Sequence, residues 1–506
     1  MSGRVEAAGR QVEEVDREFR MLIDGEWTPA ESGETFSCVD PYLEEAWGRV
    51  PLAGPADVDR AVRAARRAFD EDGWPRTSAA SRAALLRRLA SLLEANADAL
   101  ARRQVRENGK LITEMRPGVD VVAADCYFFA GLAETLHGVT VPVGPPNFVG
   151  YTLREPIGVV AAITPWNTPL GLLGWKLFPA LAAGNTVVVK PSEVTPTSTL
   201  ALAELVVEAG FPPGIVNVVT GYGDSTGTAL VGHPGVDKIA FTGSTGTGRA
   251  IARIAAERNA RVSLELGGKS PNVVFADADL GNAVNGIMAG VFAATGQTCM
   301  AGSRVLIEDG VYDEVAELLV RRGALIRAGD PLDPATQLGP LASRAQLDKV
   351  LAYIELGKAD GNRLLGGGRR PYRRGFFVEP TVFGDVDNAT RIAREEIFGP
   401  VVCLIRFRDE DEALRLANDT QFGLAAGVWT ENVRRAHRMV GRLRAGTVWV
   451  NNYRVVGHGL PFGGFKQSGL GREMGIDALH AYTEVKSVWI DTGNTVHFAY
   501  GSESDD

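Results

Sequence analysis

The sequence predicts an α/β protein with a parallel sheet covered by helices on both faces, followed by a second α/β unit. From residue 158 onward, short apolar and β-branched runs alternate with segments long enough to form helices, which is typical of βαβ units. Residues 55–105 carry apolar residues at helical spacing, and a second alternating series begins near residue 285 and continues past residue 450. The chain of 506 residues has room for roughly two to four structural units.

The first predicted elements are helices. Val58, Val62, Ala65 and Phe69 follow one another at intervals of four, three and four residues, and residues 85–103 obey the same rule. Residues at these intervals lie on one side of an α-helix. We therefore expect these helices to cover one face of the predicted sheet.

The predicted strands of the first sheet are almost wholly apolar. They comprise residues 158–164, 185–190, 215–220, 238–242 and 262–266. Continuous apolar runs are typical of parallel strands buried on both faces, and such sheets bind ligands beyond the carboxyl ends of their strands. The candidates for a site are therefore the polar and glycine residues that follow the runs: Asn167, Lys190, Glu193, Gly243 to Gly248 and Glu265.

The second series ends in a strand-like segment. The series contains residues 291–308, a helix over 311–326, and strands at 401–407, 423–430 and 446–452. Residues 480–493 also alternate like a strand, yet little of their own predicted domain remains for them to pair with. We expect this last segment to pair with another subunit.

The composition excludes several classes of protein. Hydrophobic residues make up 45% of the chain and charged residues 23%, as in soluble globular proteins. The 53 Lys and Arg against 62 Asp and Glu give a net charge of −9, which argues against a nucleic acid as partner. No run reaches the roughly 18 apolar residues of a membrane helix, and the charged start has no apolar signal core. We expect a cytoplasmic protein that binds neither a nucleic acid nor a membrane.

The chain has four cysteines, which lie far apart in the sequence: Cys38, Cys126, Cys299 and Cys403. They form no C-x-x-C motif and no cluster with histidine, so the sequence suggests neither a disulfide framework nor a metal site. Cys38 and Cys403 lie in strand-like segments and Cys126 in a helical one, which favours buried thiols. Cys299 differs, because the small residues around it in GQTCMAGSR (296–304) leave room for a substrate.

A glycine-rich turn follows the fourth predicted strand. Residues 243–248 (GSTGTG) lead into the helix-like segment RAIARIAAERN. A junction of this kind presents backbone N–H groups and the positive end of a helix dipole, which suits a phosphate or pyrophosphate. The spacing is not G-x-G-x-x-G, and the G-K-[ST] ending of an ATP-binding loop is missing, so a tight turn without a ligand stays an alternative.

Residues 190–193 (KPSE) end the neighbouring strand. A carboxylate at this place can accept hydrogen bonds from both ribose hydroxyls of a dinucleotide, and it would repel a 2′-phosphate. Glu193 therefore favours NAD over NADP. The alternative is that Glu193 caps the helix that follows.

Cys299 is the candidate nucleophile and Glu265 the candidate base. A reactive thiol needs a base or a positive environment, and none of the six histidines is an obvious partner. Glu265 is an acid in an apolar strand followed by two glycines, where burial would raise its pKa towards values suited to a base. A buried salt bridge with Lys269 or Arg261 is the alternative for Glu265.

Seven motifs occur in order along the chain. They are PWN (165–167), KPSE (190–193), FTGST (241–245), LELGGKSP (264–271), GQTC (296–299), EEIFGPV (395–401) and PFGGFKxSGxGRE (461–473). Together they resemble the NAD(P)-dependent aldehyde dehydrogenase superfamily, and the surrounding phrases resemble its bacterial broad-specificity branch. The resemblance covers roughly residues 20–490, and Glu265 and Cys299 are 34 residues apart.

The resemblance implies an aldehyde-dehydrogenase-like fold in three parts. These are a Rossmann-type NAD domain, an α/β catalytic domain and a small β element for oligomerisation. The implied boundaries are 1–136 and 157–267 for the NAD domain, with 468–483 packing back on it, 268–467 for the catalytic domain, and 137–156 with 484–500 for the oligomerisation element. A homodimer or homotetramer would follow.

The resemblance also implies the chemistry, which needs no metal. Cys299 would attack the aldehyde carbon to give a thiohemiacetal, whose oxyanion is held by the Asn167 amide and the Cys299 backbone N–H. Hydride transfer to NAD would leave a thioester, and Glu265 would activate the water that hydrolyses it to the acid. Lys176 and Glu473 match positions that relay the proton outward.

For the cofactor, the resemblance implies a set of residues at the ends of the strands and in the second unit. Lys190 and Glu193 would hold the adenosine ribose, the glycine-rich turn and Trp166 would lie along the pyrophosphate, and Glu396 would hold the nicotinamide ribose. A helix-end cap and a core aromatic are the alternatives for Glu396 and Phe398. The full set is Ile163, Thr164, Trp166, Lys190, Ser192, Glu193, Gly223, Thr242, Gly243, Ser244, Gly248, Leu266, Glu396 and Phe398.

Further positions match the substrate tunnel of the family. They are Thr168, Gly171, Leu172, Trp175, Ala293, Thr298, Met300, Val456, His458 and Phe462. Several are small where relatives specialised for small aldehydes carry aromatics, and none is an arginine, so we expect medium-to-large aliphatic, aromatic or terpenoid aldehydes. His458 either binds a substrate oxygen or lies in solvent at the tunnel mouth.

Three other functions remain as alternatives. Arg454 lies close enough to the tunnel positions to keep a semialdehyde substrate open. A CoA-acylating enzyme would need no hydrolytic base, so Glu265 counts against it. A role without redox chemistry, as a thioesterase or a crystallin-like protein, is disfavoured by the joint presence of Cys299, Glu265, Asn167 and Glu193.

Overall fold

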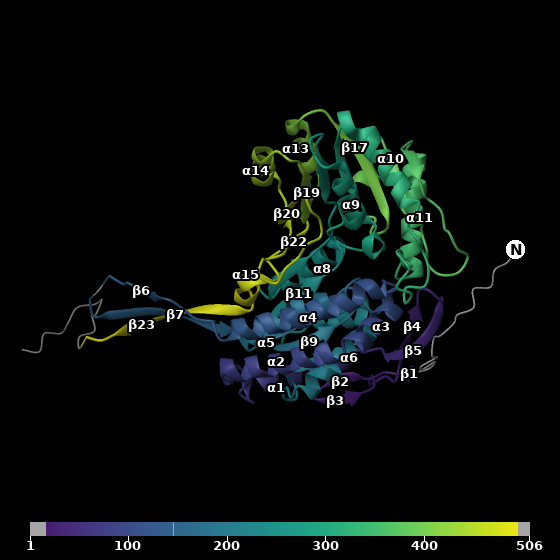
Figure 1. Ribbon diagram of the computed structural model, residues 1–506. Coiled ribbons are helices and arrows are strands. Elements are labelled where there is room, and N and C mark those ends of the chain that lie inside the picture. Colours follow the sequence, from purple (N-terminus) through teal and green to yellow (C-terminus); the bar gives the residue numbers. More distant parts are fainter. Residues whose placement is uncertain (1–16, 145, 494–506) are drawn as a thin grey trace, which may run out of the picture.

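In the computed structural model, which describes residues 17–144 and 146–493, two sheets with their helices form the body and a third sheet projects as an arm (Figure 1). The first sheet has the strand order β22-β12-β11-β8-β9-β10-β2-β3. Its central strands are parallel: β8 (Val159–Ile163), β9 (Thr186–Lys190), β10 (Val216–Val218), β11 (Lys238–Thr242) and β12 (Arg261–Glu265). Antiparallel strands close its two edges: β22 (Gly469–Leu470) on one side, β2 (Met21–Ile23) and β3 (Glu26–Thr28) on the other. The predicted α/β class is confirmed.

The register of the first sheet aligns the ends of its strands. Ile163 lies opposite Lys190 on one side and Phe241 on the other, and Thr242 lies opposite Glu265. Because parallel strands end at the same edge, the polar residues that follow them share one side of the sheet.

Helices cover this sheet in more than one layer. α1 (Pro55–Asp70) contacts β8, β9 and β10, as predicted for a helix on a sheet face. α2 (Ala79–Ala95) and α3 (Ala97–Asn108) instead make their main contacts with the helices α4 (Ile112–Ala133), α5 (Pro169–Ala183) and α6 (Pro196–Glu208). The expectation that all of residues 55–105 lie on the sheet is therefore wrong for α2 and α3, since helical spacing records an apolar face but not what it packs against.

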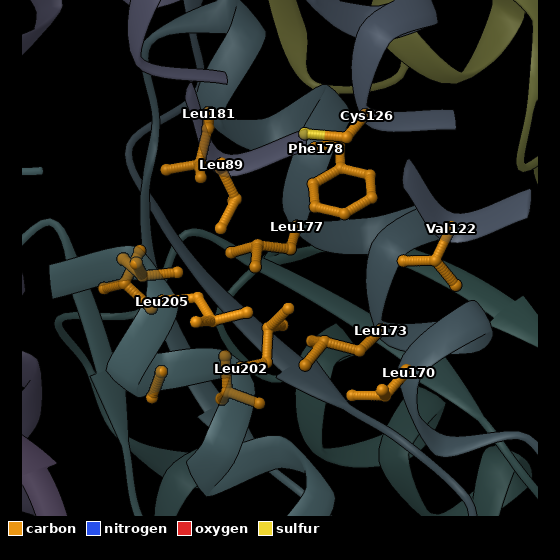
Figure 2. Packing of buried hydrophobic residues seen from close by; sticks show 14 of the residues in the cluster. Leu89, Val122, Cys126, Leu170, Leu173, Leu177, Phe178, Leu181, Leu202 and Leu205 are labelled. Atoms are coloured by element: carbon orange, nitrogen blue, oxygen red, sulfur yellow. The ribbon is translucent and has the colours of Figure 1, made fainter. Parts of the chain in front are cut away.

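The leucine face of α5 is the centre of this helical layer (Figure 2). Leu170, Leu173, Leu177 and Leu181 repeat at helical spacing and are fully shielded from water. Each such side chain contributes roughly 1.5–3 kcal/mol by leaving water. They pack among residues of α2, α4 and α6, which include Leu89, Val122, Cys126, Leu202 and Leu205. This packing fixes α5, on which Trp175 and Lys176 lie.

The second sheet has the order β15-β16-β17-β14-β13-β19-β20. Its parallel strands are β13 (Pro271–Val274), β14 (Arg304–Glu308), β16 (Thr381–Gly384), β17 (Val401–Phe407), β19 (Ala425–Trp429) and β20 (Thr447–Val450), and β15 (Arg363–Gly366) is an antiparallel edge. The predicted second α/β unit is confirmed. β13 was not among the predicted strands, because its short apolar run directly follows the glycine and lysine of GGKS.

Successive side chains along the strands of the second sheet pack into two separate hydrophobic cores, one on each face. Val274, Val305 and Leu404 pack with α9 (Leu280–Val291) and α10 (Tyr312–Gly323). Val273, Leu306 and Ile405 point to the other face, against α11 (Arg344–Ala359), α13 (Glu410–Asn418) and α14 (Val433–Arg442). This alternation is the period of a strand covered on both faces.

Shorter elements complete the body. They are β1 (Arg17–Glu18), β4 (Thr35–Asp40), β5 (Glu45–Pro51), α7 (Thr228–Gly232), α8 (Thr245–Ala256), α12 (Arg391–Arg394), β18 (Phe422–Gly423), β21 (Phe465–Lys466) and α15 (Gly475–His480). Within the described ranges, none of the helices combines the length and apolar character needed to span a bilayer.

The arm consists of β6 (Thr140–Val141), β7 (Phe148–Pro156) and β23 (Thr483–Asp491). β23 pairs antiparallel with β7 along its whole length, from Thr483 opposite Pro156 to Asp491 opposite Phe148. The expectation that the last strand finds its partner in another subunit is thus wrong for this edge. Of the predicted ranges, 1–16, 145 and 494–500 lie outside the described residues.

The start of α6 generates a stability prediction. Glu107 is fully buried and accepts hydrogen bonds from the backbone N–H groups of Thr197 (2.5 Å) and Ser198 (3.1 Å). Glu107→Ala would leave both buried donors unpaired, which costs about 2–4 kcal/mol. We expect the melting temperature to fall by roughly 4 °C or more in a thermal melt. The matched control is Glu208→Ala, at the exposed end of α6. Equal melting temperatures of the two variants would contradict the prediction.

Candidate active site

Cys299 lies in a turn that follows a strained stretch of backbone. The turn follows a 3₁₀ segment (Ala293–Gly296) in which Ala294 and Thr295 both have φ of +54° and Gly296 has +71°. Left-handed backbone is unfavourable for non-glycine residues and persists only where neighbours hold it. Here the Ala294 N–H donates to the Glu114 carboxylate (2.7 Å), and the Thr295 hydroxyl donates to the Gly339 carbonyl (3.1 Å).

Two glycines let the polypeptide approach this turn closely. A Cβ on Gly268 would lie 2.3 Å from the Cys299 carbonyl oxygen, and a Cβ on Gly267 would lie 2.5 Å from Glu396 Oε2. The Gly268 N–H donates to Glu396 Oε1 at 3.0 Å. Residues 267–268 therefore bring Glu396 and Cys299 to the same place, and the helix-end cap considered for Glu396 is not what its carboxylate binds.

The residue Cys299 is partly exposed, and the pKa of its thiol is raised. Burial, followed by the negative carboxylates of Glu396 and Glu265, raises its pKa to about 12. The other thiols, Cys38, Cys126 and Cys403, are buried in the core, which confirms their predicted placement.

Asn167 lies against the same turn from the opposite side. It is buried in the loop between β8 and α5, and its Nδ2 donates to the Gln297 carbonyl at 3.1 Å, two residues before Cys299. The loop is held by Asn108, which donates to the Trp166 carbonyl (3.3 Å), and by Lys110, which donates to the Thr168 hydroxyl (3.1 Å). Burial lowers the pKa of Lys110 to about 8.

Glu265 is a buried carboxylate at the end of β12. Within the described part of the chain, neither of its oxygens has a hydrogen-bond partner. Burial, followed by repulsion from Glu473, raises its pKa well above the usual range for a glutamate, and Lys176 and Arg472 offset only part of this. The alternative salt bridges are wrong: Arg261 pairs with Glu484 (2.8 Å), and Lys269 Nζ has no hydrogen-bond partner among these residues.

Lys176 and Glu473 form a buried ion pair close to Glu265. Lys176 Nζ lies 2.5 Å from Glu473 Oε1 and also donates to the Thr242 hydroxyl (2.6 Å) and the Leu172 carbonyl (3.3 Å). Both side chains are shielded from water, and Glu473 Oε2 has no hydrogen-bond partner in the described residues. Among the described residues, Glu473 Oε2 is therefore the atom of this pair that is left without a donor.

At the carboxyl end of β9, Lys190 is buried while the Glu193 side chain is 40% exposed, and their charged groups lie 3.6 Å apart. Burial lowers the pKa of Lys190. In the described residues no hydrogen bond joins Glu193 to α6, whose first N–H groups bind Glu107 instead. The helix-cap alternative for Glu193 is therefore wrong, and its carboxylate is accessible to a ligand.

The glycine-rich turn joins β11 directly to α8. Ser244 caps the helix by accepting the Thr247 N–H at 3.2 Å. A Cβ on Gly248 would lie 2.4 Å from the Leu266 side chain, so glycine lets α8 start close against the end of β12, while a Cβ on Gly246 would meet nothing within 4 Å. The helix N-terminus is thus open to an anion, as a pyrophosphate site requires.

The remaining predicted cofactor residues lie near the carboxyl ends of the strands of the first sheet. The Thr164 N–H donates to the Lys190 carbonyl (3.2 Å) next to Ile163, and the Ser192 hydroxyl accepts the Val194 N–H (3.2 Å). Gly223 opens a short helical turn (Gly223–Gly227). Trp166 and Phe398 meet edge to face at 5.2 Å, and Phe398 is only partly buried, unlike a core aromatic.

The predicted substrate positions fall into two groups. Trp175 and Phe462 pack at 5.3 Å, with Leu172 buried on the same helix as Trp175, and Gly171 faces Thr168. Met300 and Val456 pack on the core of the second sheet, and Ala293 and Thr298 flank the Cys299 turn. Among described residues no group of three His, Cys, Asp or Glu could hold a metal ion.

Asp125 was missed by the sequence analysis and lies beside this group. Its Oδ2 accepts the Trp175 indole N–H at 3.2 Å, and burial raises its pKa to about 7. His458 Nδ1 lies 3.9 Å from Asp125 Oδ1, with half of the His458 side chain exposed. A lone acid within the apolar stretch 121–133 was the available signal.

Comparison with known proteins gives one consistent result. Residues 27–488 match the model of the aldehyde dehydrogenase family. DhaS of Bacillus subtilis (strain 168), named as an aldehyde dehydrogenase, is 48% identical over 473 residues, covering 93% of this chain and 95% of its own. An NAD⁺ complex of aldehyde dehydrogenase from Bacillus cereus is 44% identical, with a TM-score of 0.93 over 94% of this chain and 97% of that one. Betaine aldehyde dehydrogenase from Staphylococcus aureus in complex with NAD⁺ is 38% identical, with a TM-score of 0.93 over 94% and 95%.

The raised pKa of Cys299 generates a prediction about its reactivity. Only the thiolate reacts with iodoacetamide, and below a pKa of about 12 its fraction grows about tenfold per pH unit. In cofactor-free protein we expect the alkylation rate of Cys299 to rise in this way from about pH 7 to about pH 10 without a plateau. Mass spectrometry of the Cys299→Ser variant provides the background, and a plateau near the ordinary thiol pKa of about 8.5 would contradict the prediction.

Proposed function

The chain belongs to the aldehyde dehydrogenase family, and we propose that it oxidises aldehydes to carboxylic acids with NAD as the hydride acceptor. One observation carries the proposal: a partly exposed thiol, a buried amide donor and a buried carboxylate without a partner converge on the Cys299 turn. These are the nucleophile, the oxyanion donor and the base that oxidation through a thioester requires.

The residues at the edge of the first sheet fit a dinucleotide. The open start of α8 suits the pyrophosphate, the exposed Glu193 carboxylate suits the ribose hydroxyls, and Trp166, Phe398 and Glu396 line the path towards Cys299. When bound, the nicotinamide supplies the acceptor for the hydride. The NAD⁺ complexes of relatives support this choice, and the accessible Glu193 carboxylate supports NAD over NADP.

The first chemical step belongs to Cys299 and Asn167. The Cys299 thiol gives its proton to the neighbouring Glu265 carboxylate, the sulfur adds to the aldehyde carbon, and the carbonyl oxygen becomes a negatively charged oxyanion. The Asn167 Nδ2, which now donates to Gln297, is close enough to turn to this oxygen together with the Cys299 backbone N–H. Donors already in place at a buried site lower the barrier by favouring the charge that develops there.

Hydrolysis of the thioester belongs to Glu265. Because burial raises its pKa, the ionised Glu265 carboxylate is a stronger base than an ordinary glutamate and can take a proton from water. The oxygen of that water bonds to the thioester carbon, the carbon–sulfur bond breaks, and the acid leaves Cys299 as the thiolate. The proton can pass on to Glu473, whose Oε2 is unpaired among the described residues and whose Oε1 is held by Lys176. A buried base without such a path would stay protonated after one turnover.

The substrate proposed for this site has an apolar body of medium to large size. Trp175, Phe462 and Leu172 present apolar surface, and Gly171 and Ala293 leave space. We further propose that the first sheet carries the cofactor, that the second carries the thiol, and that the arm joins subunits into a homodimer or homotetramer. Exposed apolar residues on the arm support the last point: Val149, Leu153, Val485, Trp489 and Ile490.

The proposal is tested by NADH formation at 340 nm with purified protein and aldehydes from acetaldehyde through octanal, citral and benzaldehyde to succinic semialdehyde. We expect turnover without CoA, higher kcat/KM for the larger apolar aldehydes, and a preference for NAD over NADP. Cys299→Ala should lose activity by at least about 1000-fold and still bind NAD. A strict CoA requirement would favour the acylating enzyme, and a response to succinic semialdehyde alone would overturn the apolar substrate.

Glu265→Gln tests whether Glu265 is needed for thioester hydrolysis but not for hydride transfer. Because glutamine cannot take a proton, the thioester should accumulate after one hydride transfer. We expect a burst of about one NADH per active site in stopped-flow absorbance, followed by a steady rate at least about 100-fold below the wild type. Normal steady turnover would show that another group activates the water.

A further inference from the structure

Asp125 is a buried carboxylate for which the proposed reaction has no use. It lies on α4 and is only 2% exposed. Its Oδ2 accepts the Trp175 indole N–H at 3.2 Å, but its Oδ1 has no hydrogen-bond partner in the described residues, although it is shielded from water. Half of its hydrogen-bonding capacity is therefore unused.

An unpaired buried acceptor is costly and needs an explanation. Such an oxygen costs roughly 1–3 kcal/mol relative to one that has a donor. His458 Nδ1 is 3.9 Å away, which exceeds the reach of a hydrogen bond. An oxygen or nitrogen donor of a ligand can lie within hydrogen-bond distance of both groups.

Aromatic side chains surround Asp125, which is a polar group among them. Trp175 packs on Phe462 at 5.3 Å, and the His458 ring packs on Phe128 at 4.9 Å. Aromatic walls with a single convergent polar group hold ligands that are apolar along most of their length and polar at one point. His458 is the exposed member of this pair: half of its side chain is exposed, whereas the Asp125 side chain is buried.

The position of Asp125 along α4 separates it from Glu114. Glu114, one of the groups that hold the Cys299 turn, lies eleven residues before Asp125 on the same helix. Eleven residues of α-helix rise about 16 Å. Asp125 and the carboxylate that binds the segment before Cys299 therefore lie at well separated points along α4.

We propose that Asp125 is a specificity-determining residue whose free carboxylate oxygen accepts a hydrogen bond from a hydroxyl or ammonium group at the remote end of an otherwise apolar aldehyde. This inference rests on the proposed function, since it concerns the substrate of the same site. It adds a polar terminus to the apolar body proposed above.

The test compares aldehydes that differ only at the remote end. A hydroxyl many carbons from the carbonyl leaves its reactivity unchanged, so ω-hydroxyalkanals and alkanals of eight to twelve carbons form matched pairs. In the wild type we expect kcat/KM to be roughly tenfold higher for the best hydroxylated member than for its plain partner. In Asp125→Leu the ratio should fall to about one, mainly through a higher KM for the hydroxylated aldehyde.

Three variants separate recognition from structural support. Trp175→Phe removes the indole donor but keeps Asp125, so it should keep the preference if Asp125 binds substrate and lose it if Asp125 only positions Trp175. Asp125→Asn keeps an acceptor and should retain part of the hydroxyl preference while losing any preference for an ω-ammonium aldehyde. Asp120→Asn, on the exposed side of the same helix, should behave as wild type.

A binding measurement keeps the inference independent of turnover. In Cys299→Ala, quenching of tryptophan fluorescence should report tighter binding of 1,10-decanediol than of 1-decanol, and Asp125→Leu should remove the difference. Equal binding of both alcohols, or an unchanged kcat/KM ratio in Asp125→Leu, would overturn the inference and leave the aldehyde oxidation intact. Failure to oxidise any aldehyde, with the diol still preferred, would overturn the proposed function but not the hydrogen bond at Asp125.

Discussion

The close backbone approach at residues 267–268 is the constraint on which the site depends. β12 ends the parallel part of the first sheet at Glu265, and β13 starts the second sheet at Pro271, so the connection between the two sheets passes through these glycines. Any side chain there would collide with Glu396 or with the Cys299 backbone. Because no side chain fills that space, Glu265 at the end of the first sheet, Cys299 and the Glu396 carboxylate lie close to the short connection between the two sheets.

The charges at this junction raise the pKa values of both Glu265 and Cys299 above those of the free side chains. Lys176 is fully buried, and its ammonium contacts Glu473 rather than Glu265, so Glu265 is left with burial and a negative neighbour. Cys299 in turn faces two carboxylates. A thiol with a raised pKa has a small thiolate fraction at neutral pH, so it reacts slowly as a nucleophile.

Much of this could be predicted from the sequence, because the information is local. The first sheet is made of uninterrupted apolar runs, and the residues after them lie at one edge as a consequence of parallel pairing. Contacts between residues far apart in the sequence could not be predicted from these local patterns. β23 pairs with β7 across more than 300 residues, and Lys110 and Glu114 support the catalytic loops from helices that periodicity could only describe as amphipathic. Asp125 was visible in the sequence as an acid in an apolar stretch. Its proposed role depends on the Trp175 indole and the His458 imidazole, which only the fold brings next to it.

The same contacts bear on which aldehydes the site can accept. A substrate carboxylate, as in a short dicarboxylic semialdehyde, needs a cation, and Arg454 keeps its charge and further N–H donors although one nitrogen donates to the Ala289 carbonyl. Near Trp175, however, the substrate carboxylate would meet the Asp125 carboxylate, whose charge repels an anion. A wholly apolar aldehyde avoids that repulsion but leaves the free Asp125 oxygen without a donor. On the role proposed for Asp125, an aldehyde with an apolar body and a neutral or cationic donor at its far end satisfies both the aromatic surface and the carboxylate. This requirement is narrower than the size and polarity of the lining residues suggest.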